Sequence, residues 1–358
     1  MKIAVLEFVC GGGVKGSNSV GCTPPDLASY RHLYREGFAM LGSLASDISK
    51  CGHDVVTCLD TNAKDAGAQQ ELTTHRVACN VIHSSNAWLE DWIETAEQCD
   101  TTIIIAPELD NILFQTVAAL RNHGLHVLSS SLPFLQATTD KWMSSKLLAA
   151  HNVHQPQTWM LSEYLSIHLQ HPSTPMTLKR RDGAGCVGMR FFENANDLNR
   201  YVKNESNGCQ ANLDQWLVQP WHGGQPASIA LVAHPGSAKF LGSLEQSIHI
   251  EPLNDQRVYN VSYRGGAGPI RSIDFERLEQ TAEAVLEALP RGALGWIGID
   301  LLLPSAQDPE ITVIEINPRL TTSYLGYRKW YGPALANLLL GISVEPPTPS
   351  MPNIVFEV

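Results

Sequence analysis

Two carboxylates and an amide occur close together in two segments that alternate apolar and polar residues. Asp300 lies in "GWIGIDLLLP", and Glu315 and Asn317 lie in "ITVIEINPR". The intervening "SAQDPE" contains the turn-favouring residues Pro, Asp and Ser, so the two segments are predicted to form a β-hairpin. A symmetric turn places Asp300 directly across from Glu315, with Asn317 on the same face. The pattern therefore predicts three oxygen-bearing side chains that converge on one side of a hairpin.

The opposite face of this hairpin is predicted to pack into the core, because its residues are mostly aliphatic. That face carries Ile297, Ile299, Leu301 and Leu303 from the first strand and Thr312, Ile314 and Ile316 from the second.

The opposed carboxylates need compensation if they are buried. Like charges directly across a sheet destabilise it, and a buried carboxylate is costly unless it is paired. A cation would compensate, and two carboxylates with an amide oxygen suit Mg²⁺ shared with nucleotide phosphates. Calcium is less favoured because the protein supplies few ligands. The alternative is a pair of exposed carboxylates on an edge hairpin, without a metal.

A phosphate-binding segment should accompany such a metal. The chain has no G-x-x-x-x-G-K-[ST] motif, but Lys179 ends "PMTLK" directly before "RRDGAGCVG". A lysine beside a glycine-rich loop can contact phosphates through its charge and through backbone N–H groups. The alternative is a solvated turn. In combination with the hairpin, this segment favours a nucleotide site.

Short apolar strands alternate with helices over the first 135 residues, which predicts a parallel sheet. The strands are expected over Lys2–Val9, Asp54–Asp60, Thr101–Pro107 and His126–Ser131, and the helices over Leu27–Lys50 and around Gln115–Asn122. Ligands bind at the carboxyl ends of such strands. Glu7, Asp60 and Glu108 are therefore expected either to face a cleft or, alternatively, to cap turns or face solvent.

The segment Gly11–Gly16, "GGGVKG", fits G-x-G-x-x-G. A dinucleotide fingerprint needs a helix that opens directly from the glycines, whereas here "SNSVGCTPPD" intervenes. We interpret the segment as a loop over a small-molecule pocket and keep a dinucleotide oxidoreductase as an alternative.

The rest of the chain predicts a mixed, largely antiparallel part, so the fold class is α/β (α+β). A helix is expected to be capped near Thr139, another to span Asp274–Leu289, and a closing helix to lie around Pro333–Leu340. The predicted domains are residues 1–135, 136–218 and 219–343, followed by a proline-rich linker or extended tail over 344–358.

The bulk composition narrows the function. The chain has 358 residues and a formal charge of −11, which argues against nucleic acid or an anionic membrane as a partner. The eight cysteines are scattered without a metal-ligand spacing, and the apolar run at the start is short and interrupted by Glu7. A reduced, cytoplasmic protein is expected.

The ordered set of motifs resembles the ATP-grasp superfamily of ATP-dependent carboxylate ligases over roughly Thr139 to Gly341. The set consists of Lys141 in "TDK", Lys179 before "RRDGAGCVG", "LVQPW" at Leu217–Trp221, Asp300 in "GIDLLL", and "EINPR" at Glu315–Arg319. The resemblance implies an ATP-grasp fold with an N-terminal Rossmann-like pre-ATP-grasp domain.

The resemblance also implies residue roles. Lys141 and Lys179 would hold the ATP phosphates, Gly183, Gly185 and Gly188 would form a mobile phosphate lid, Gln219, Trp221 and His222 would lie at the adenine edge, and Asp300, Glu315 and Asn317 would bind magnesium. Many relatives carry a glutamate in the "QPWHGGQPAS" segment for adenine or ribose recognition. Its absence leaves His222 and Ser228 as candidates for the ribose.

Two arginines, together with Lys179, are candidates for catalysis. Arg319 could pair with the transferred phosphoryl group. Arg264 precedes Gly265 and Gly266, whose N–H groups could face an oxyanion or could form a plain tight turn. The segment Thr321–Tyr324 would either line the acceptor pocket or cap a helix and supply a core tyrosine.

The implied reaction is amide formation through an acyl phosphate, with ATP and two Mg²⁺ ions, for which Mn²⁺ could substitute. The substrates would be a small carboxylic acid and an amine, and the protein could form a homodimer. "EFVCGGG" and "INPRLTTSYLGYRKW" are similar to the group of tyramine–glutamate ligases. The alternatives are a ligase for another acid or short peptide, a bicarbonate-using carboxylase, and a non-catalytic nucleotide-binding regulator.

Overall fold

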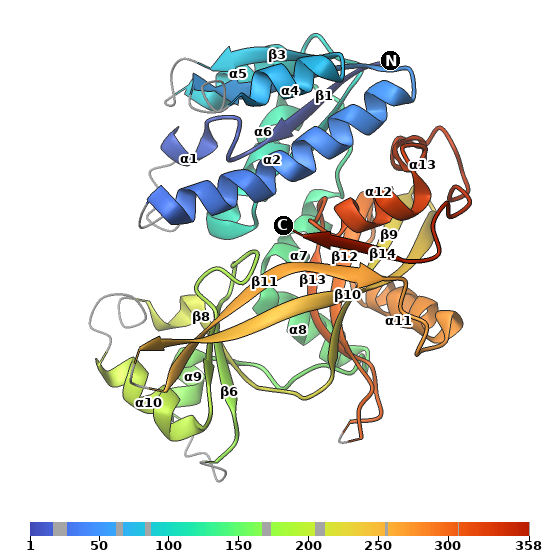
Figure 1. The fold of residues 1–358 in the computed structure, drawn as a ribbon. Helices are drawn as coiled ribbons and strands as arrows, with labels where there is room; N and C mark the ends of the chain where they lie inside the picture. The colour runs from blue at the N-terminus through green and yellow to red at the C-terminus, as the bar shows by residue number, and fades with distance from the viewer. Residues whose placement is uncertain are drawn as a thin grey trace.

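A four-stranded parallel sheet forms the N-terminal part of the protein, shown at the top of Figure 1. The computed structural model describes residues 1–16, 27–61, 67–82, 87–166, 173–204, 212–254, 257–306 and 308–357. The strand order is β3-β2-β1-β4, with β1 Lys2–Glu7, β2 Asp54–Asp60, β3 Val77–Ile82 and β4 Thr101–Ile105. The predicted parallel sheet is therefore confirmed.

Two details of this sheet differ from the sequence prediction. Strand β3 was not predicted, because its "VACNVI" is an edge strand with partly exposed residues rather than an apolar run. The expected strand over His126–Ser131 is wrong, since only Val127 forms a single bridge, to Thr102.

Helices cover both faces of the parallel sheet. They are α2 Leu27–Lys50, α4 Ala68–Thr74, α5 Trp88–Ala96 and α6 Ile112–Asn122, with the short α1 Gly13–Gly16 and the 3₁₀ turn η2 Leu109–Asn111. Side chains alternate across β1, so Ile3 and Val5 pack with α2 while Ala4 and Leu6 pack with α5 and α6. This burial on both faces explains the nearly continuous apolar sequence of β1.

The glycines after β1 are required by close packing. The N–H groups of Gly11 and Gly13 donate to the carbonyl oxygens of Glu7 and Phe8 at 2.8 and 2.9 Å. A Cβ at Gly13 would lie 2.2 Å from the Phe8 ring, and one at Gly11 would lie 2.8 Å from Trp92. The N–H groups of Gly11 and Gly13 are thus used in hydrogen bonds within the turn, and this geometry gives no support to a dinucleotide site. The "SNSVGCTPPD" segment lies outside the described residues.

A ten-stranded sheet forms the rest of the core, and all of its described pairings are antiparallel. The order is β13-β12-β9-β10-β11-β7-β6-β8-β5, and β14 pairs with β11. Its strands are β5 Trp159–Met160, β6 Met176–Arg180, β7 Arg190–Phe192, β8 Trp216–Pro220, β9 Gln225–His234, β10 Ser237–Asn254, β11 Val258–Gly268, β12 Gly295–Leu303, β13 Thr312–Asn317 and β14 Ile354–Glu357.

The long strands β10 and β11 connect two parts of this sheet (Figure 1). At one end they meet β6, β7 and β8, which we call the lid part, and at the other they meet β9, β12 and β13. The predicted domain boundary at 218/219 falls inside β8.

The remaining helices pack around this sheet. They are α7 Leu132–Thr139, α8 Lys141–Ala150, α9 Leu161–Ser166, α10 Ala195–Asn204, α11 Phe275–Ala288, α12 Tyr324–Tyr331 and α13 Leu335–Leu339, with the turn η3 Leu213–Gln215. Asp140 caps α8 by accepting from the N–H groups of Trp142 and Met143. The predicted cap near Thr139 was therefore one residue early, and Thr139 itself ends α7.

The hairpin of β12 and β13 contains a β-bulge that the symmetric turn did not predict. Asp300 is opposite Glu315, as predicted, but Leu301 is opposite Val313, so Ile314 is the extra residue. Val313 consequently joins the core, whereas Ile314 lines a cavity. The prediction of Ile314 as a core residue is wrong for this reason.

The end of the chain returns to the sheet. Ile354 and Phe356 are buried while Val355 is exposed, the alternation of a half-buried strand. The segment after the prolines is thus a strand paired with β11 rather than an extended tail. No helix among the described residues has the length and apolarity needed to span a membrane.

The described cysteines form no disulfide bond in the structure. Those at 10, 51, 58, 79, 99 and 186 are free thiols. Cys22 and Cys209 lie outside the described residues.

Candidate active site

A cavity of about 740 Å³ lies between the two sheets. Its lining comes from the end of β1, the helix α2, the glycine-rich loop after β6, the end of β8, and the facing strands β10 to β13. The carboxyl edge of the parallel sheet thus meets the polar face of the β12–β13 hairpin. Most of the residues predicted to do chemistry lie in or beside this cavity.

The two carboxylates and the amide converge, as predicted. Asp300 and Glu315 are cross-strand partners, and Asn317 Nδ2 donates to Asp300 Oδ2 at 3.0 Å. Gln246 Nε2 donates to the other oxygen, Oδ1, at 2.8 Å. Burial, reinforced by the charge of Glu315, raises the pKa of Asp300 to about 7. The charged form of Asp300 is therefore disfavoured by burial and by the neighbouring Glu315, and a bound cation would offset both effects.

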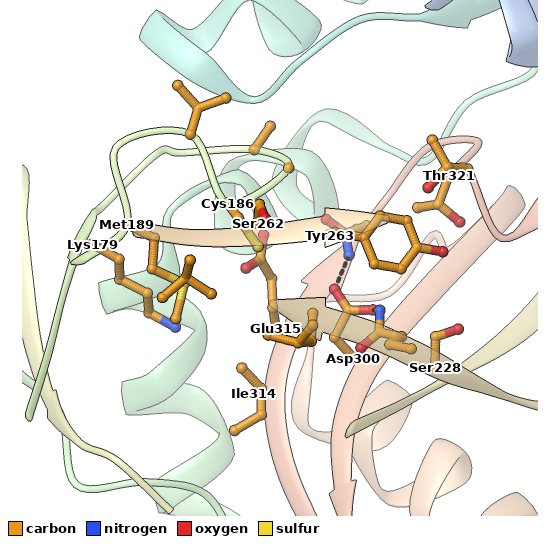
Figure 2. Close-up of a pocket in the computed structure, with 18 of the residues that line it drawn as sticks. Lys179, Cys186, Met189, Ser228, Ser262, Tyr263, Asp300, Ile314, Glu315 and Thr321 are labelled. Atoms are coloured by element: carbon orange, nitrogen blue, oxygen red, sulfur yellow. Dashed lines mark hydrogen bonds between the residues drawn. The ribbon is translucent and has the colours of Figure 1, made fainter. Parts of the chain in front are cut away.

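Two lysines lie next to this pair. Lys141 Nζ is 2.9 Å from Glu315 Oε1 and also donates to the carbonyl oxygen of Gly183. Lys179 is 6% exposed, and Figure 2 shows it in the same pocket as Glu315 and Asp300. Burial lowers the pKa of Lys179 to about 8, with a smaller contribution from the charge of Lys141, while Glu315 opposes that shift. An anion bound here would stabilise both ammonium groups.

The glycine-rich loop forms one wall of the cavity. Gly185 and Gly188 line it and have positive φ angles of 60° and 74°, which glycine tolerates without a steric cost. Gly183 lies behind the lining, where its carbonyl oxygen receives Lys141. Cys186 also lines the cavity, and burial raises the pKa of its thiol to about 12.

The end of β8 borders the cavity as expected, with Gln219, Trp221 and His222 in its lining. Gln219 Nε2 is engaged with Thr158 Oγ1 at 2.8 Å, and the Trp221 N–H donates to the Pro175 carbonyl at 2.9 Å. These two hydrogen bonds hold Gln219 and Trp221 in fixed positions at the edge of the cavity.

The two ribose candidates lie in different surroundings. His222 lies just after the end of β8, and its Nδ1 is 3.6 Å from Oδ2 of Asp308. Ser228 is the cross-strand partner of Asp300, and its buried Oγ has no hydrogen-bond partner among the described residues. Ser228 therefore lies at the carboxylate end of the cavity (Figure 2).

Arg319 is held by a residue from the other sheet. Its Nε and Nη2 atoms donate to the two carboxylate oxygens of Glu108, each at 2.9 Å; Glu108 is buried and Arg319 is largely buried. Arg319 still lines the cavity next to Asn317. Glu108 was expected either to face a cleft or to cap a turn or face solvent, whereas it is buried against Arg319 and is not among the residues that line the cavity. Its partner was not predicted, because 211 positions separate the two residues.

Arg264 does not reach the cavity lining. Its side chain is half exposed and pairs with Glu251 on β10. Gly265 pairs with β14, and Gly266 pairs with both β10 and β14, so both lie within a strand rather than in the open turn that an oxyanion site would need. The predicted catalytic role of Arg264 is therefore withdrawn.

Both alternatives predicted for the segment after Arg319 apply, each to different residues. Thr321, Thr322 and Ser323 line the cavity, whereas Tyr324 is a fully buried core residue that donates to Asp47 Oδ2 at 2.9 Å. The roles differ because α12 begins at Tyr324, whose side chain points towards Asp47 on α2.

The sequence did not indicate two further lining residues. Gln246 and Tyr263 come from the middle of long antiparallel strands, where nothing in the local pattern marks them. Gln246 reaches Asp300 across β9, which lies between β10 and β12 in the sheet. Glu7 also lines the cavity, and burial raises its pKa to about 7.

Comparison with protein families gives two matches along the chain. A model described as an ATP-grasp domain matches residues 138–323, just over half of the chain, and a pre ATP-grasp 3 domain matches residues 53–133. The first match contains the hairpin, both lysines and the glycine-rich loop.

Individual relatives are distant. The tyramine–L-glutamate ligase of Methanocaldococcus fervens is 24% identical over 246 residues, 68% of this chain and 66% of the relative. The ligase of the same name from Methanocaldococcus jannaschii is 23% identical over 247 residues, 68% of this chain and 63% of the relative. The chain thus matches less than two thirds of either relative.

Solved structures share the fold. A putative ATP-grasp superfamily protein from Archaeoglobus fulgidus has a TM-score of 0.62 at 22% identity, with 95% of this chain and 88% of that chain covered. A biotin carboxylase from Campylobacter jejuni has a TM-score of 0.63 at 15% identity, with 96% and 71% covered. Because the ATP-grasp model covers more than half of its residues, the chain belongs to the ATP-grasp family.

Proposed function

We propose that the protein is an ATP-dependent carboxylate–amine ligase that forms an amide through an acyl phosphate and releases ADP and phosphate. The observation that carries this proposal is the meeting of Lys141 and Lys179 with Asp300 and Glu315 at one end of a cavity. Cationic groups for phosphate and hard oxygen ligands for a metal are the requirements of phosphoryl transfer from a nucleotide.

The carboxylate end fits Mg²⁺. Asp300 and Glu315 face each other on adjacent strands, and burial, reinforced by the charge of Glu315, raises the pKa of Asp300. The described residues contain no group of three or more His, Cys, Asp or Glu that could hold a metal alone. Asp300, Glu315 and Asn317 would therefore share two Mg²⁺ ions, or Mn²⁺, with phosphate oxygens. Bound magnesium neutralises charge on the phosphates.

The other residues position the nucleotide. Lys141 and Lys179 bind the phosphates, and the loop that contains Gly183, Gly185 and Gly188 covers them. Gln219, Trp221 and His222 lie at the adenine end, with His222 the ribose candidate farther from the carboxylates.

The chemistry has two balanced steps. A substrate carboxylate oxygen attacks the γ-phosphorus of ATP, the bond to the β-phosphate oxygen breaks, and ADP leaves. After the ammonium group of the amine has lost a proton to solvent, its nitrogen attacks the acyl carbonyl carbon, phosphate departs with the bonding pair, and a second proton leaves the nitrogen. Arg319, fixed by Glu108, would orient the transferred phosphoryl group.

The names of the two relatives support specific substrates. We propose L-glutamate as the acid and tyramine or a tyrosine-like amine as the acceptor, as in a methanofuran-type cofactor pathway.

The test is incubation with ATP and Mg²⁺ together with a panel of acids and amines, scored by ADP release and product mass. Hydroxylamine is added in separate samples to trap an acyl phosphate as a hydroxamate. We expect ADP and an amide only when a matching acid is present. ADP with bicarbonate alone would instead indicate a carboxylase, and no ADP with any acid would refute the ligase.

A further inference from the structure

The part of the cavity formed by the N-terminal sheet and α2 has a distinct charge pattern. Among the described lining residues between positions 7 and 109, two are carboxylates, Glu7 and Glu36, and none is Lys, Arg or His. The others are apolar residues or glycine, including Phe8, Val9, Leu33 and Met40. We call this part the N-terminal subsite.

The lining from the rest of the chain carries charges of both signs. Lys179, Arg190, His222 and Arg319 line the cavity there, together with the carboxylates of Glu251, Asp300 and Glu315. Among the described lining residues, the basic side chains therefore all lie outside the N-terminal subsite.

Glu7 is the buried carboxylate of this subsite. It is 3% exposed at the end of β1, and its Oε2 accepts from the Cys10 N–H at 2.7 Å. No ion pair to Glu7 forms within the described part of the chain. Arg319 influences it only through space, because that guanidinium is paired with Glu108. A buried carboxylate without a cation is costly, which is why its pKa is raised.

The backbone of α2 is shaped to receive Glu7. A Cβ at Gly37 would lie 2.6 Å from the Glu7 carboxylate, so only glycine allows the helix to approach it this closely. Gly37 also lines the cavity. The carboxylate is thus fixed from two sides, by the Cys10 amide and by α2, while the cavity is open to it.

We propose that the N-terminal subsite binds the amine substrate as a primary ammonium with an apolar body, and that Glu7 is its counter-ion. An ammonium group would supply the charge that Glu7 lacks, and the apolar body would contact Phe8, Leu33 and Met40. An amine that also carries a carboxylate would be disfavoured, because that carboxylate would lie close to the like charge of Glu7. This inference rests on the proposed ligase function and selects simple amines over amino acids.

Three related compounds test the subsite by calorimetric binding. Tyramine has the ammonium group and an aromatic body, 4-ethylphenol lacks the nitrogen, and tyrosine adds a carboxylate. The titrations are made at pH 8, with and without a non-hydrolysable ATP analogue and Mg²⁺. Since a charge-assisted hydrogen bond is worth about 1.5–3 kcal/mol, tyramine should bind about tenfold to a hundredfold more tightly than either other compound.

The variant Glu7→Gln tests the counter-ion, because it keeps the shape and removes the charge. Its affinity for tyramine should fall about tenfold or more, and its affinity for 4-ethylphenol should not change. Glu94→Gln, at an exposed position on α5, is the matched control and should bind tyramine like the unchanged protein.

The outcomes are separable from those of the proposed function. The subsite is refuted if the unchanged protein binds none of the three compounds at millimolar concentration, if tyrosine binds as tightly as tyramine, or if Glu7→Gln has no effect. If hydroxylamine still traps an acyl phosphate in any of these cases, the ligase proposal stands and only the subsite falls. If tyramine binds as expected but no acid supports ADP release, the ligase proposal falls and the subsite stands.

Discussion

Glu108, which follows β4, and Arg319, which follows β13, form a bidentate ion pair between the parallel sheet and the β12–β13 hairpin. The two hydrogen bonds are both 2.9 Å long, and the side chains are 2% and 11% exposed. The pair fixes the guanidinium at the boundary of the cavity. It also ties the two sheets together at the position where the substrates would meet.

Replacing Glu108 by glutamine should destabilise the protein. The change leaves a buried guanidinium without its counter-charge, which costs about 3 kcal/mol of unfolding free energy. Urea unfolding followed by circular dichroism measures this. Glu251→Gln breaks the half-exposed pair with Arg264 and is the control, with an expected change below about 1 kcal/mol. Equal effects of the two changes would contradict the structural role of the Glu108–Arg319 pair.

Replacing Glu315 by glutamine should reduce ADP formation by about a hundredfold or more, because the variant loses a metal ligand charge and the partner of Lys141. The assay is ADP release at increasing Mg²⁺ concentration. Glu310→Gln, an exposed residue near the same hairpin, should behave like the unchanged protein. Unimpaired ADP release by Glu315→Gln would refute the metal assignment.

The affinity for ATP should weaken as the pH rises above about 8. Burial lowers the pKa of Lys179 from its ordinary value of 10.5 to about 8, so the protein loses the ammonium charge that the phosphates need. Titration of an ATP analogue between pH 7 and about 9.5 measures the dissociation constant. In Lys179→Arg the guanidinium stays charged, so the affinity should be weaker but independent of pH in this range. A constant affinity in the unchanged protein would contradict the assignment of Lys179.

The same lysine should affect stability with the opposite trend. Its folded pKa is below the unfolded value, so between about pH 8 and 10.5 the unfolded chain binds more protons than the folded one. The cost of burying the charge is present below pH 8 and is relieved as the pH rises through this window. Lys179→Met should remove this contribution to the pH dependence of unfolding.

Two glycines of α2 should respond differently to alanine. A Cβ at Gly37 would overlap Glu7, so Gly37→Ala should cost about 1–3 kcal/mol of stability and weaken tyramine binding. At Gly42 the nearest atom to a Cβ is 3.9 Å away, so Gly42→Ala should be stabilising by up to about 1 kcal/mol through helix propensity. Thermal unfolding of both variants measures this. A neutral Gly37→Ala would show that α2 does not hold Glu7.

The sequence by itself determined the features that depend on neighbouring residues. The alternation on both sides of a short turn placed Asp300 opposite Glu315, and the apolar strands of the first 135 residues indicated a parallel sheet. Lys179 beside its glycine-rich loop also followed from a local pattern. These features are local because strand alternation, turn chemistry and helix periodicity act over a few residues.

Only the tertiary structure decided the features that depend on distant segments. The bulge at Ile314, the pairing of β14 with β11, and the outward direction of Arg264 follow from how strands register against each other. The partner of Arg319 and the surroundings of Glu7 depend on the packing of the two sheets across the cavity. The periodicity of the sequence predicts which face of a strand or helix a side chain occupies. Its contact partner depends on which other segment the fold brings to that face, and this depends on the packing of the whole core.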